Sequence, residues 1–413
     1  MFNLSEIQSA LREFQLDGWL VGDFRGSNLL GRRVLGFADD QIRSRRWFYF
    51  IPAEGEPRKL VHRIETDSLD ALPGAKTIYL RWQEFEAGLQ QLVAATAGQA
   101  TIATAGQASS GTRRIAMEYS PRNANPYVSR IDAGTLELVR GFGCEIVSSG
   151  DLIQRFEAVW DDEQWVMHQE AARHTNAAYD VAWRFIAQRT GSGGAALETE
   201  VQAAIMEHFR ANGLTTYHPP IVAANAHSGD PHFDTSPATD IAMREGDFVL
   251  IDLWAKLDRP RSVYSDLTRV GFIGREVPQK YERVFQIVAA ARDAAIAKVR
   301  DAFAARRPLA GWEVDQAARD VIDQAGYGQH FIHRTGHNIG QEVHGNGANM
   351  DNLEMHDERR VLPGTCFSIE PGIYLPEFGI RSEVDVFVDR SGQVHVTGGE
   401  LQRKVVPILA HSS

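Results

Sequence analysis

The chain has 413 residues, of which 43% are hydrophobic and 23% are charged. This composition is typical of a soluble globular protein, and the length exceeds that of one ordinary core, so we expect two domains. The formal net charge of −11 leaves no general basic surface for phosphate backbones or anionic lipids, and the sequence has no local basic patch. We therefore expect neither nucleic acid nor a membrane as a partner, and we favour a small-molecule or peptide substrate.

Two further features indicate the compartment. Cys144 and Cys366 are the only cysteines and lie far apart, which favours neither a disulfide framework nor a thiolate metal site. The opening MFNLSEIQSALREF carries charges where a signal peptide would be apolar, and no later run reaches membrane-spanning length. We therefore expect a cytoplasmic protein.

The first half of the chain alternates short helical and strand patterns. SEIQSALREFQLDGWLVG predicts an amphipathic helix followed by a strand, and RRWFYFIPAEGEPRKLVH predicts two strands around a turn. The segment AATAGQATIATAGQASSGT contains AGQA twice without a sustained period, which predicts a loop around a strand rather than a repeat fold. These patterns predict an α/β domain over residues 1–156.

Three long helical patterns follow in the second half. DDEQWVMHQEAARHTNAAYDVAWRFIAQR predicts a helix that ends at the flexible TGSGGAA segment. QKYERVFQIVAAARDAAIAKVRDAFAA and WEVDQAARDVIDQAG predict two more, the second with Gly326 as its C-cap. Apolar strands lie between and after them, so residues 157–413 are expected to form a second domain that carries the chemistry.

Four expected strands or turns of this half each carry an acid. DFVLIDLW is apolar throughout, as in a buried strand, except for Asp252, and a hairpin would bring it close to Asp266 in VYSDLTRV. CFSIEPGIY places Glu370 before a Pro-Gly turn. IRSEVDVFV alternates with period two, which predicts one strand with Arg381 and Glu383 on the same face.

Histidines lie in two nearby segments. HRTGHNIGQEVHG places His333, His337 and His344 among glycines, and HSGDPHFD contains His232. Taken singly, each acid is most simply a salt-bridge partner and each histidine a satisfied polar side chain. Several carboxylates buried together, however, need cations or protons to neutralise them. Four carboxylates with one imidazole can hold two divalent ions about 3.5–4 Å apart and activate a water for hydrolysis.

The settings LID, SDLTR, TGHNIG, IEPGIY and RSE, in this order, resemble the pita-bread-fold metallopeptidases, which include Xaa-Pro aminopeptidase, prolidase and methionine aminopeptidase. The first half is similar in size and style to the creatinase-like domain of the proline-specific members, which methionine aminopeptidases lack. The resemblance implies an α/β (α+β) chain with a creatinase/prolidase-like N-terminal domain, residues 1–156. A pita-bread catalytic domain, residues 157–413, would follow it.

The resemblance also implies a set of metal ligands. Asp252 would chelate one ion, Asp266 and Glu383 would bridge two ions, and His337 and Glu370 would bind the second. Oxygen-rich ligation with one imidazole favours Mn²⁺, with Co²⁺, Fe²⁺ or Zn²⁺ also suitable. The glycines Gly336 and Gly340 would let the backbone around the imidazole pack tightly.

Catalytic roles follow from the same resemblance. Glu370 would be the general base for the attacking water, and His232 and His344 would contact the substrate and stabilise the oxyanion. Tyr374 and Arg381 match the proton-relay tyrosine and the arginine beside the last ligand. Because a prolyl nitrogen carries no N–H, its protonation as it leaves is an essential step.

The resemblance therefore implies cleavage of Xaa-Pro bonds at the N-terminal end of short proline-containing peptides by a homodimeric enzyme. A prolidase restricted to Xaa-Pro dipeptides is the alternative within the family. A non-catalytic binding module is another, although no ligand is missing. A metal-dependent phosphoesterase lacks a visible phosphate clamp, and a metal-free creatinase-like hydrolase would not need four carboxylates.

Two features depart from the family pattern. Trp254 stands where the family usually has glycine, two residues after the first aspartate. The connection from Asp252 to Asp266 also looks longer than usual. Both features lie beside the expected metal site, so we expect them to affect substrate preference more than any other property. His333 has no role in the resemblance, and we expect it either to be structural or to support the residues that form the site.

Overall fold

The computed structural model describes residues 2–38, 41–94 and 112–411. The chain folds into two compact units, with the division after Glu157. The segment that contains AGQA twice, for which the sequence predicts a loop around a strand, falls almost entirely outside the described residues.

The first unit is built on one six-stranded sheet in the order β4-β3-β2-β1-β5-β6. Its strands are β1 (Gly18–Asp23), β2 (Trp47–Pro52), β3 (Arg58–His62), β4 (Ala75–Tyr79), β5 (Arg113–Met117) and β6 (Cys144–Ser148). Its helices are α1 (Leu4–Glu13), α2 (Leu29–Val34), α3 (Trp82–Val93), α4 (Ala133–Gly141) and α5 (Gly150–Glu157). The predicted helix, strand and strand pair at the start of the chain are confirmed as α1, β1 and the antiparallel pair β2–β3.

Local sequence explains how α1 begins and which face it buries. The side chain of Asn3 accepts a hydrogen bond from the backbone N–H of Glu6, which satisfies one of the unpaired donors at the helix start. Ile7, Ala10 and Leu11 recur at helical spacing, and all are buried in the core of the first unit.

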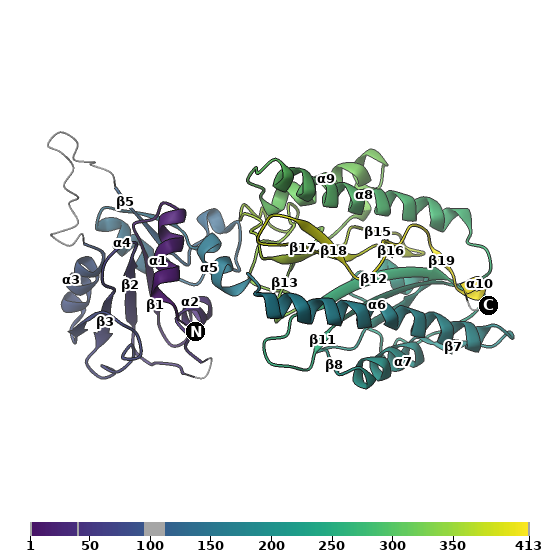
Figure 1. Ribbon diagram of the computed structural model, residues 1–413, viewed down its shortest axis with the longest axis horizontal. Coiled ribbons are helices and arrows are strands. Elements are labelled where there is room, and N and C mark those ends of the chain that lie inside the picture. Colours follow the sequence, from purple (N-terminus) through teal and green to yellow (C-terminus); the bar gives the residue numbers. More distant parts are fainter. Residues whose placement is uncertain (1, 39–40, 95–111, 412–413) are drawn as a thin grey trace. The chain divides into compact units, whose positions relative to one another are not determined.

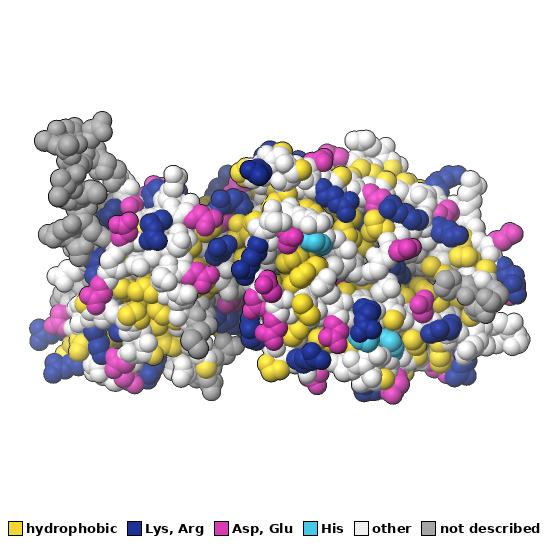
Figure 2. All heavy atoms as spheres, in the orientation of Figure 1, with side chains coloured by type: hydrophobic (Ala, Val, Ile, Leu, Met, Phe, Trp, Pro, Cys, Tyr) yellow, Lys and Arg dark blue, Asp and Glu magenta, His cyan; other side chains and the backbone are white. Residues whose placement is uncertain are grey.

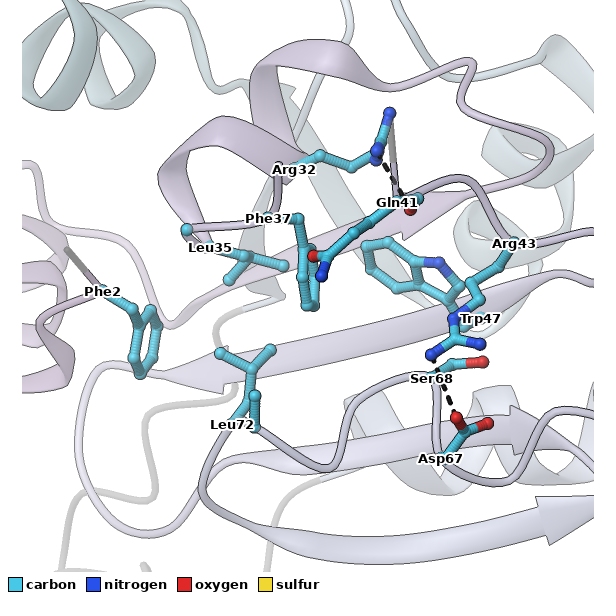
Figure 3. Close-up of a pocket in the computed structure, with 12 residues that line it drawn as sticks. Phe2, Arg32, Leu35, Phe37, Gln41, Arg43, Trp47, Asp67, Ser68 and Leu72 are labelled. Carbon is cyan, nitrogen blue, oxygen red and sulfur yellow. Dashed lines mark hydrogen bonds and ion pairs between the residues drawn. The ribbon is translucent and has the colours of Figure 1, made fainter. Parts of the chain in front are cut away.

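The first unit also contains a pocket of about 420 Å³ (Figure 3). It lies against Trp47 of β2, and Arg43 on its rim is ion-paired with Asp67 at 3.1 Å. Arg32 donates to the backbone oxygen of Gln41 at 3.0 Å. The charged groups that Figure 3 labels in this pocket therefore already have partners within the protein.

In the second unit, long helices flank the strands. Figure 1 shows α6 (Asp162–Thr190) with α7 (Glu198–Ala211) on one side and α8 (Gln279–Ala304) with α9 (Gly311–Gln324) on the other. The three predicted long helices are confirmed as α6, α8 and α9, and Gly326 adopts a φ of 83° just after α9. Helix α7 is an addition that the sequence patterns did not predict.

The strands of the second unit form several small sheets. They are β7 (Ala196–Leu197), β8 (Leu214–Thr215), β9 (Ile221–Ala224), β10 (Ala242–Met243), β11 (Phe248–Leu257), β12 (Ser265–Phe272), β13 (Asn338–Ile339), β14 (Cys366–Ile369), β15 (Gly372–Tyr374), β16 (Gly379–Arg381), β17 (Val384–Val388), β18 (Val394–Thr397) and β19 (Val406–Pro407). One sheet has the order β19-β12-β11-β8, with β9 also paired to β11, and another has the order β13-β14-β17-β18. Strands β15 and β16 pair only with each other among the described residues.

The single strand predicted for IRSEVDVFV is wrong. The chain leaves β16 at Arg381 and enters β17 at Val384, which belongs to a different sheet. Glu383 lies in this break, and Glu370 lies in the equivalent break between β14 and β15. Each break places an acidic side chain where the backbone passes from one sheet to the next.

The surface carries charges of both signs. Figure 2 shows Lys and Arg side chains interspersed with Asp and Glu on the displayed face of the described chain. None of the helices within the described part combines the length and the apolar character that crossing a bilayer requires.

Candidate metal centre

The hairpin of β11 and β12 brings the first two predicted ligands together. Asp252 pairs across the strands with Thr268, and Trp254 pairs with Asp266. Because alternate side chains of a strand share a face and cross-strand partners lie on the same side, all four side chains are expected on one face of the hairpin. Asp252 is 7% exposed and Asp266 is 4% exposed, so both carboxylates are buried.

Three of the predicted ligands converge closely. One ligand atom from each of Asp266, His337 and Glu383 lies within 4.8 Å of the other two. Nε2 of His337 is 3.6 Å from Oδ2 of Asp266 and 3.4 Å from Oε1 of Glu370. Glu370 therefore joins the same group through the imidazole.

Thr268 links Asp252 to the rest of the group. Its hydroxyl oxygen lies 2.7 Å from Oε2 of Glu383 and 3.2 Å from Oδ1 of Asp252. Arg381 donates from Nε to the same oxygen at 3.0 Å and forms an ion pair with Oδ2 of Asp252. Arg381 and Glu383 thus both reach Thr268, although they do not share a strand.

The electrostatics of this group favour bound cations. Burial, followed by the charges of neighbouring acids, raises the pKa of Asp266 and of Glu383 well above its ordinary value. Burial also raises the pKa of Glu370 to about 7. For Asp252 burial raises the pKa, even though the charge of Arg381 opposes the shift. Four carboxylates with one guanidinium are under-neutralised, so protons or bound divalent ions have to compensate the charge in such a site.

The state of the imidazole fits the same interpretation. Burial is the main reason that the pKa of His337 lies well below its ordinary value, so the ring is neutral at physiological pH. A neutral imidazole is the form that binds metal. The set of carboxylate oxygens and one neutral imidazole nitrogen suits Mn²⁺ or another divalent ion of similar hardness.

Of the two glycines near His337, only Gly336 is needed for close packing of the backbone. A Cβ at Gly336 would lie 1.9 Å from the backbone oxygen of Ser368, so glycine is required for this close approach. The approach allows Ser368 Oγ to accept from the backbone N–H of His337 at 3.0 Å. A Cβ at Gly340 would meet nothing closer than 3.9 Å, so the predicted packing role of Gly340 is wrong.

A chain of polar contacts connects the predicted relay residues. Arg381 donates from Nη1 to the hydroxyl of Tyr374 at 3.3 Å, and that hydroxyl lies 2.7 Å from Nε2 of His333. Burial raises the pKa of Tyr374 above its ordinary value, so the phenol stays protonated. His333, for which the sequence left a structural or a supporting role open, is the direct partner of Tyr374.

The two histidines predicted to contact substrate lie near the same group. The ring of His344 approaches the ring of His337 edge-on, with centroids 4.3 Å apart. The side chain of His232 is exposed, and its charge lowers the pKa of Asp252, which places it within electrostatic reach. Both histidines are accessible at the surface, as a substrate contact requires.

Sequence patterns missed a set of residues that hold the ligands. Arg292 of α8 is fully buried and donates to Ser382 Oγ at 2.6 Å. Arg269 donates to the backbone oxygen of Glu383 at 3.2 Å, and the carboxylate of Asp385 accepts from the N–H of Asp266 at 3.1 Å. One feature of the sequence could have indicated a buried role for Arg292, namely its position on the otherwise apolar, core-facing side of its helix.

Fold and centre together define a metallopeptidase. The model of metallopeptidase family M24 matches residues 167–390, more than half of the chain. The protein therefore belongs to this family, and the pita-bread domain and the enzyme class implied by the sequence are confirmed.

Relatives in sequence cover part of the chain. A Mycobacterium tuberculosis H37Rv protein named "Probable dipeptidase PepE" is 32% identical over 278 residues, which is 66% of this chain and 67% of that protein. An Xaa-Pro dipeptidase of Pyrococcus furiosus is 31% identical over 205 residues, 49% of this chain and 54% of that protein. These matches span about half to two thirds of the curated relatives.

Solved structures share the whole fold. The crystal structure of dipeptidase PepE from Mycobacterium ulcerans is similar with a TM-score of 0.62 and 23% identity, over 98% of this chain and 96% of that chain. The prolidase from Pyrococcus horikoshii OT3 is similar with a TM-score of 0.55 and 21% identity, over 97% of this chain and 99% of that chain. The two-domain architecture predicted from the sequence is therefore confirmed.

Proposed function

We propose that the protein is a dinuclear-metal hydrolase that cleaves Xaa-Pro bonds at the N-terminal end of short peptides. The observation that carries this proposal is the buried group of Asp266, His337 and Glu383, whose ligand atoms lie within 4.8 Å of one another. The relative named Xaa-Pro dipeptidase supports the proline specificity.

The five candidate ligands divide between two ions. Asp252 would hold one ion, His337 and Glu370 would hold the second, and Asp266 and Glu383 would contribute to both. Bound divalent ions polarise the scissile carbonyl and make water a better nucleophile at neutral pH. Manganese is the ion we propose, because the donor set is mostly carboxylate oxygen, and Co²⁺, Zn²⁺ or Fe²⁺ are the alternatives.

Glu370 is the general base in this proposal. It accepts the proton of the attacking water and passes it to the prolyl nitrogen as that nitrogen leaves. Its side chain is 12% exposed, compared with 5% for Asp266, so it is the more accessible of the two acids beside His337. A group that meets both water and substrate needs this access.

The histidines and the relay residues act on the substrate. His232 and His344 donate to the carbonyl oxygen and stabilise the negative charge that develops on it. Tyr374, whose hydroxyl accepts from Arg381 and donates to the neutral His333, is the relay residue on the leaving side of the scissile bond, and Glu370 supplies the proton that the leaving nitrogen takes up. The ion pair of Arg381 with Asp252 opposes the effect of burial, which raises the pKa of this carboxyl.

The experiment compares Ala-Pro with Ala-Pro-Ala. The protein is treated with a chelator, reconstituted with MnCl₂ and assayed for release of alanine, with Ala-Ala and Ala-Ala-Ala as controls. Metal-dependent cleavage of the tripeptide identifies an aminopeptidase, and cleavage of the dipeptide alone identifies a prolidase, which the relatives named dipeptidase favour. If neither peptide is cleaved, the proposal is wrong, and the alternative of a non-catalytic binding module takes its place.

The proposal includes a homodimer in the cytoplasm. Cys144 and Cys366 are both buried and unpaired, which suits a reducing compartment. Sedimentation of the purified protein tests the dimer, and a monomer at all concentrations would contradict it.

A further inference from the structure

Three fully buried acids belong to α9 and to the segment between His344 and β14, namely Asp315, Asp351 and Asp357. Asp315 is ion-paired with Arg319 at 2.5 Å, and Asp357 is ion-paired with Arg359 at 2.6 Å. Asp351 has hydrogen bonds only from backbone N–H groups among the described residues. It is therefore the one acid of the three that lacks a hydrogen-bonded basic partner.

Asp351 uses only one of its two carboxylate oxygens. Its Oδ1 accepts from the backbone N–H groups of Leu353 and Glu354, both at 3.0 Å, and of Met355 at 3.2 Å. Its Oδ2 is buried and has no hydrogen-bond partner within the described part of the chain. Three donors on one oxygen favour the ionised carboxylate, whereas a buried charge without a partner is costly. The carboxylate is thus fixed in place, and one of its oxygens is unsatisfied.

Thr335 is the residue opposite Asp351. Gly336 and Met350 form an antiparallel bridge in which each N–H donates to the carbonyl oxygen of the other residue, at 3.2 and 3.0 Å. Thr335 and Asp351 are the next pair along this bridge, and side chains of such a pair share a side, with Cβ atoms about 4.5–5.5 Å apart. Oγ1 of Thr335 is also buried and also has no hydrogen-bond partner among the described residues. We therefore expect the two unpaired oxygens to face one space.

Neither a proton nor a water fully satisfies this pair. Burial raises the pKa of Asp351, and the charges of Glu354 and Asp315 add to the shift. A proton on Oδ2 would nevertheless be a donor without an acceptor, since no hydrogen bond joins this oxygen to Thr335. A water between the two oxygens would complete their hydrogen bonds but would leave the negative charge. A cation that takes both oxygens as ligands compensates the charge as well.

The donor set indicates a monovalent ion. Asp351 has one free carboxylate oxygen, and Thr335 adds a neutral hydroxyl. Ca²⁺ takes about six to eight oxygens, often from several carboxylates, and Mg²⁺ demands near-ideal octahedral geometry. Asp315 cannot add a ligand, because its oxygens accept from Arg319 and from the N–H groups of Thr335 and Asn352. One uncompensated negative charge therefore matches one Na⁺ or K⁺.

Thr335 connects this space to the candidate metal centre. Its backbone oxygen accepts from the N–H of Glu370 at 2.7 Å, and it precedes His337 by two residues. Its own N–H donates to Oδ1 of Asp315 at 2.8 Å. An ion bound to the side chain of Thr335 would therefore fix the backbone that positions two candidate ligands.

We propose that Oδ2 of Asp351 and Oγ1 of Thr335 bind one monovalent cation, Na⁺ or K⁺, and that this ion holds the segment that carries His337 in place. Water completes the shell of the ion. The inference goes beyond the proposed function, because neither residue is among the five candidate ligands of the dinuclear centre.

Two substitutions remove the site, and two serve as controls. Asp351→Asn keeps an oxygen for the three N–H groups but removes the charge, and Thr335→Val keeps the shape of the side chain but removes the hydroxyl. Thr365→Val removes a buried hydroxyl that donates to the backbone oxygen of Leu362 at 2.7 Å. Glu358→Gln removes a charge from the same segment as Asp351, on a side chain that is 75% exposed.

Thermal unfolding in KCl, NaCl and choline chloride at equal ionic strength tests the site, once with manganese and once with EDTA. Wild type and both controls should have a Tm at least about 2 °C higher in KCl or NaCl than in choline chloride, whose cation is too large for the site. Asp351→Asn and Thr335→Val should lose this difference. The site is overturned if wild type has the same Tm in all three salts, as a buried water would give, or if the difference persists in either site variant. The wild-type comparison decides the question even where a site variant does not fold.

Calorimetric titration with Mn²⁺ tests the role of the ion. In wild type, the affinity should be about 10-fold higher in the salt that gives the higher Tm than in choline chloride, the size expected for a contact that orients metal ligands. In Asp351→Asn the affinity should not depend on the salt. Equal affinities of wild type in all three salts would overturn the supporting role. The thermal test in EDTA needs neither bound manganese nor hydrolysis, so its result stands even where the proposed function fails.

Discussion

The hydroxyl of Thr268 contacts Oε2 of Glu383 at 2.7 Å. This contact joins the β11–β12 hairpin to the break between β16 and β17, two parts of the chain that are far apart in sequence. Because the same hydroxyl oxygen accepts from Arg381 and lies 3.2 Å from Asp252, one threonine orients both ends of the carboxylate group.

Thr268→Val is therefore expected to weaken metal binding without unfolding the protein. The change keeps the shape of the side chain but removes the hydrogen bonds that orient Glu383, and loss of such a partner typically lowers metal affinity about 10- to 100-fold. Calorimetric titration with Mn²⁺ measures the affinity. Thr190→Val, which removes a buried hydroxyl in α6 bonded to the backbone oxygen of Ile186, is the control. Equal affinities of the two variants would contradict the role of Thr268.

Asp266→Asn is expected to stabilise the metal-free protein and to abolish stabilisation by Mn²⁺. The variant removes one of several buried like charges, and a rise of at least about 2 °C in Tm corresponds to the order of 1 kcal/mol. Because the folded-state pKa of Asp266 is raised, its ionisation costs stability as pH rises above the unfolded value. The gain in Tm should thus be larger at pH 8 than at pH 5.

Thermal unfolding with EDTA and with excess MnCl₂ checks this prediction. Wild type should gain Tm with manganese through mass action, and Asp266→Asn should not. The explanation is wrong if the variant is less stable than wild type in EDTA at pH 8, or if manganese stabilises both proteins equally.

Glu118 provides a test confined to the first unit. Its buried carboxylate accepts from the indole N–H of Trp19 at Oε1 and from the amide of Asn28 at Oε2, both at 2.6 Å. The amide of Glu118→Gln has only one acceptor oxygen, so it can accept a hydrogen bond from only one of these two donors. We therefore expect a loss of about 1–3 kcal/mol in the free energy of unfolding. Urea unfolding measures this loss.

The exposed Glu86→Gln on α3 is the matched control, with an expected change within about 0.5 kcal/mol. Manganese affinity should be the same in both variants, since all candidate ligands lie in the second unit. An unchanged stability of Glu118→Gln would show that its two hydrogen bonds contribute little.

His333→Gln tests the contact with Tyr374. The imidazole lies 2.7 Å from the phenol oxygen, so its removal should misplace the hydroxyl and lower kcat for Ala-Pro about 10-fold, with little change in KM. Tyr374→Phe should lower kcat by at least as much. His356→Gln, a surface histidine stacked on Trp312, is the control. If His333→Gln raises KM and leaves kcat unchanged, His333 contacts substrate instead of positioning Tyr374.

The parts of the fold that sequence patterns predicted are those set by local periodicity. Helices α6, α8 and α9 have long amphipathic or apolar patterns with clear ends, and the β11–β12 hairpin follows from two apolar runs. The division of residues 380–388 between two strands of different sheets was not predictable. The period-two alternation continues through Ser382 and Glu383, although the backbone passes from one sheet to the other there.

The candidate ligands were predictable because acids interrupting apolar strands are unusual, and the structure places them together, although their roles stay predictions. Arg292 was missed because its contact with Ser382 is tertiary and no local pattern contains it. For His333 a supporting role was left open, but its partner Tyr374 required the structure. The departure from glycine at Trp254 was visible in the sequence, whereas the packing of this ring against Tyr217 and His218 required the structure.

The central claim is that the buried carboxylates and His337 hold two ions that are needed for Xaa-Pro hydrolysis. The most direct measurement is a titration of chelator-treated protein with Mn²⁺, with bound metal and Ala-Pro hydrolysis followed on the same samples. We predict that two ions bind per chain and that activity rises with occupancy, and that Glu383→Gln loses both. Hydrolysis that persists in the chelated protein, or full occupancy by two ions without hydrolysis of any Xaa-Pro peptide, would contradict the claim.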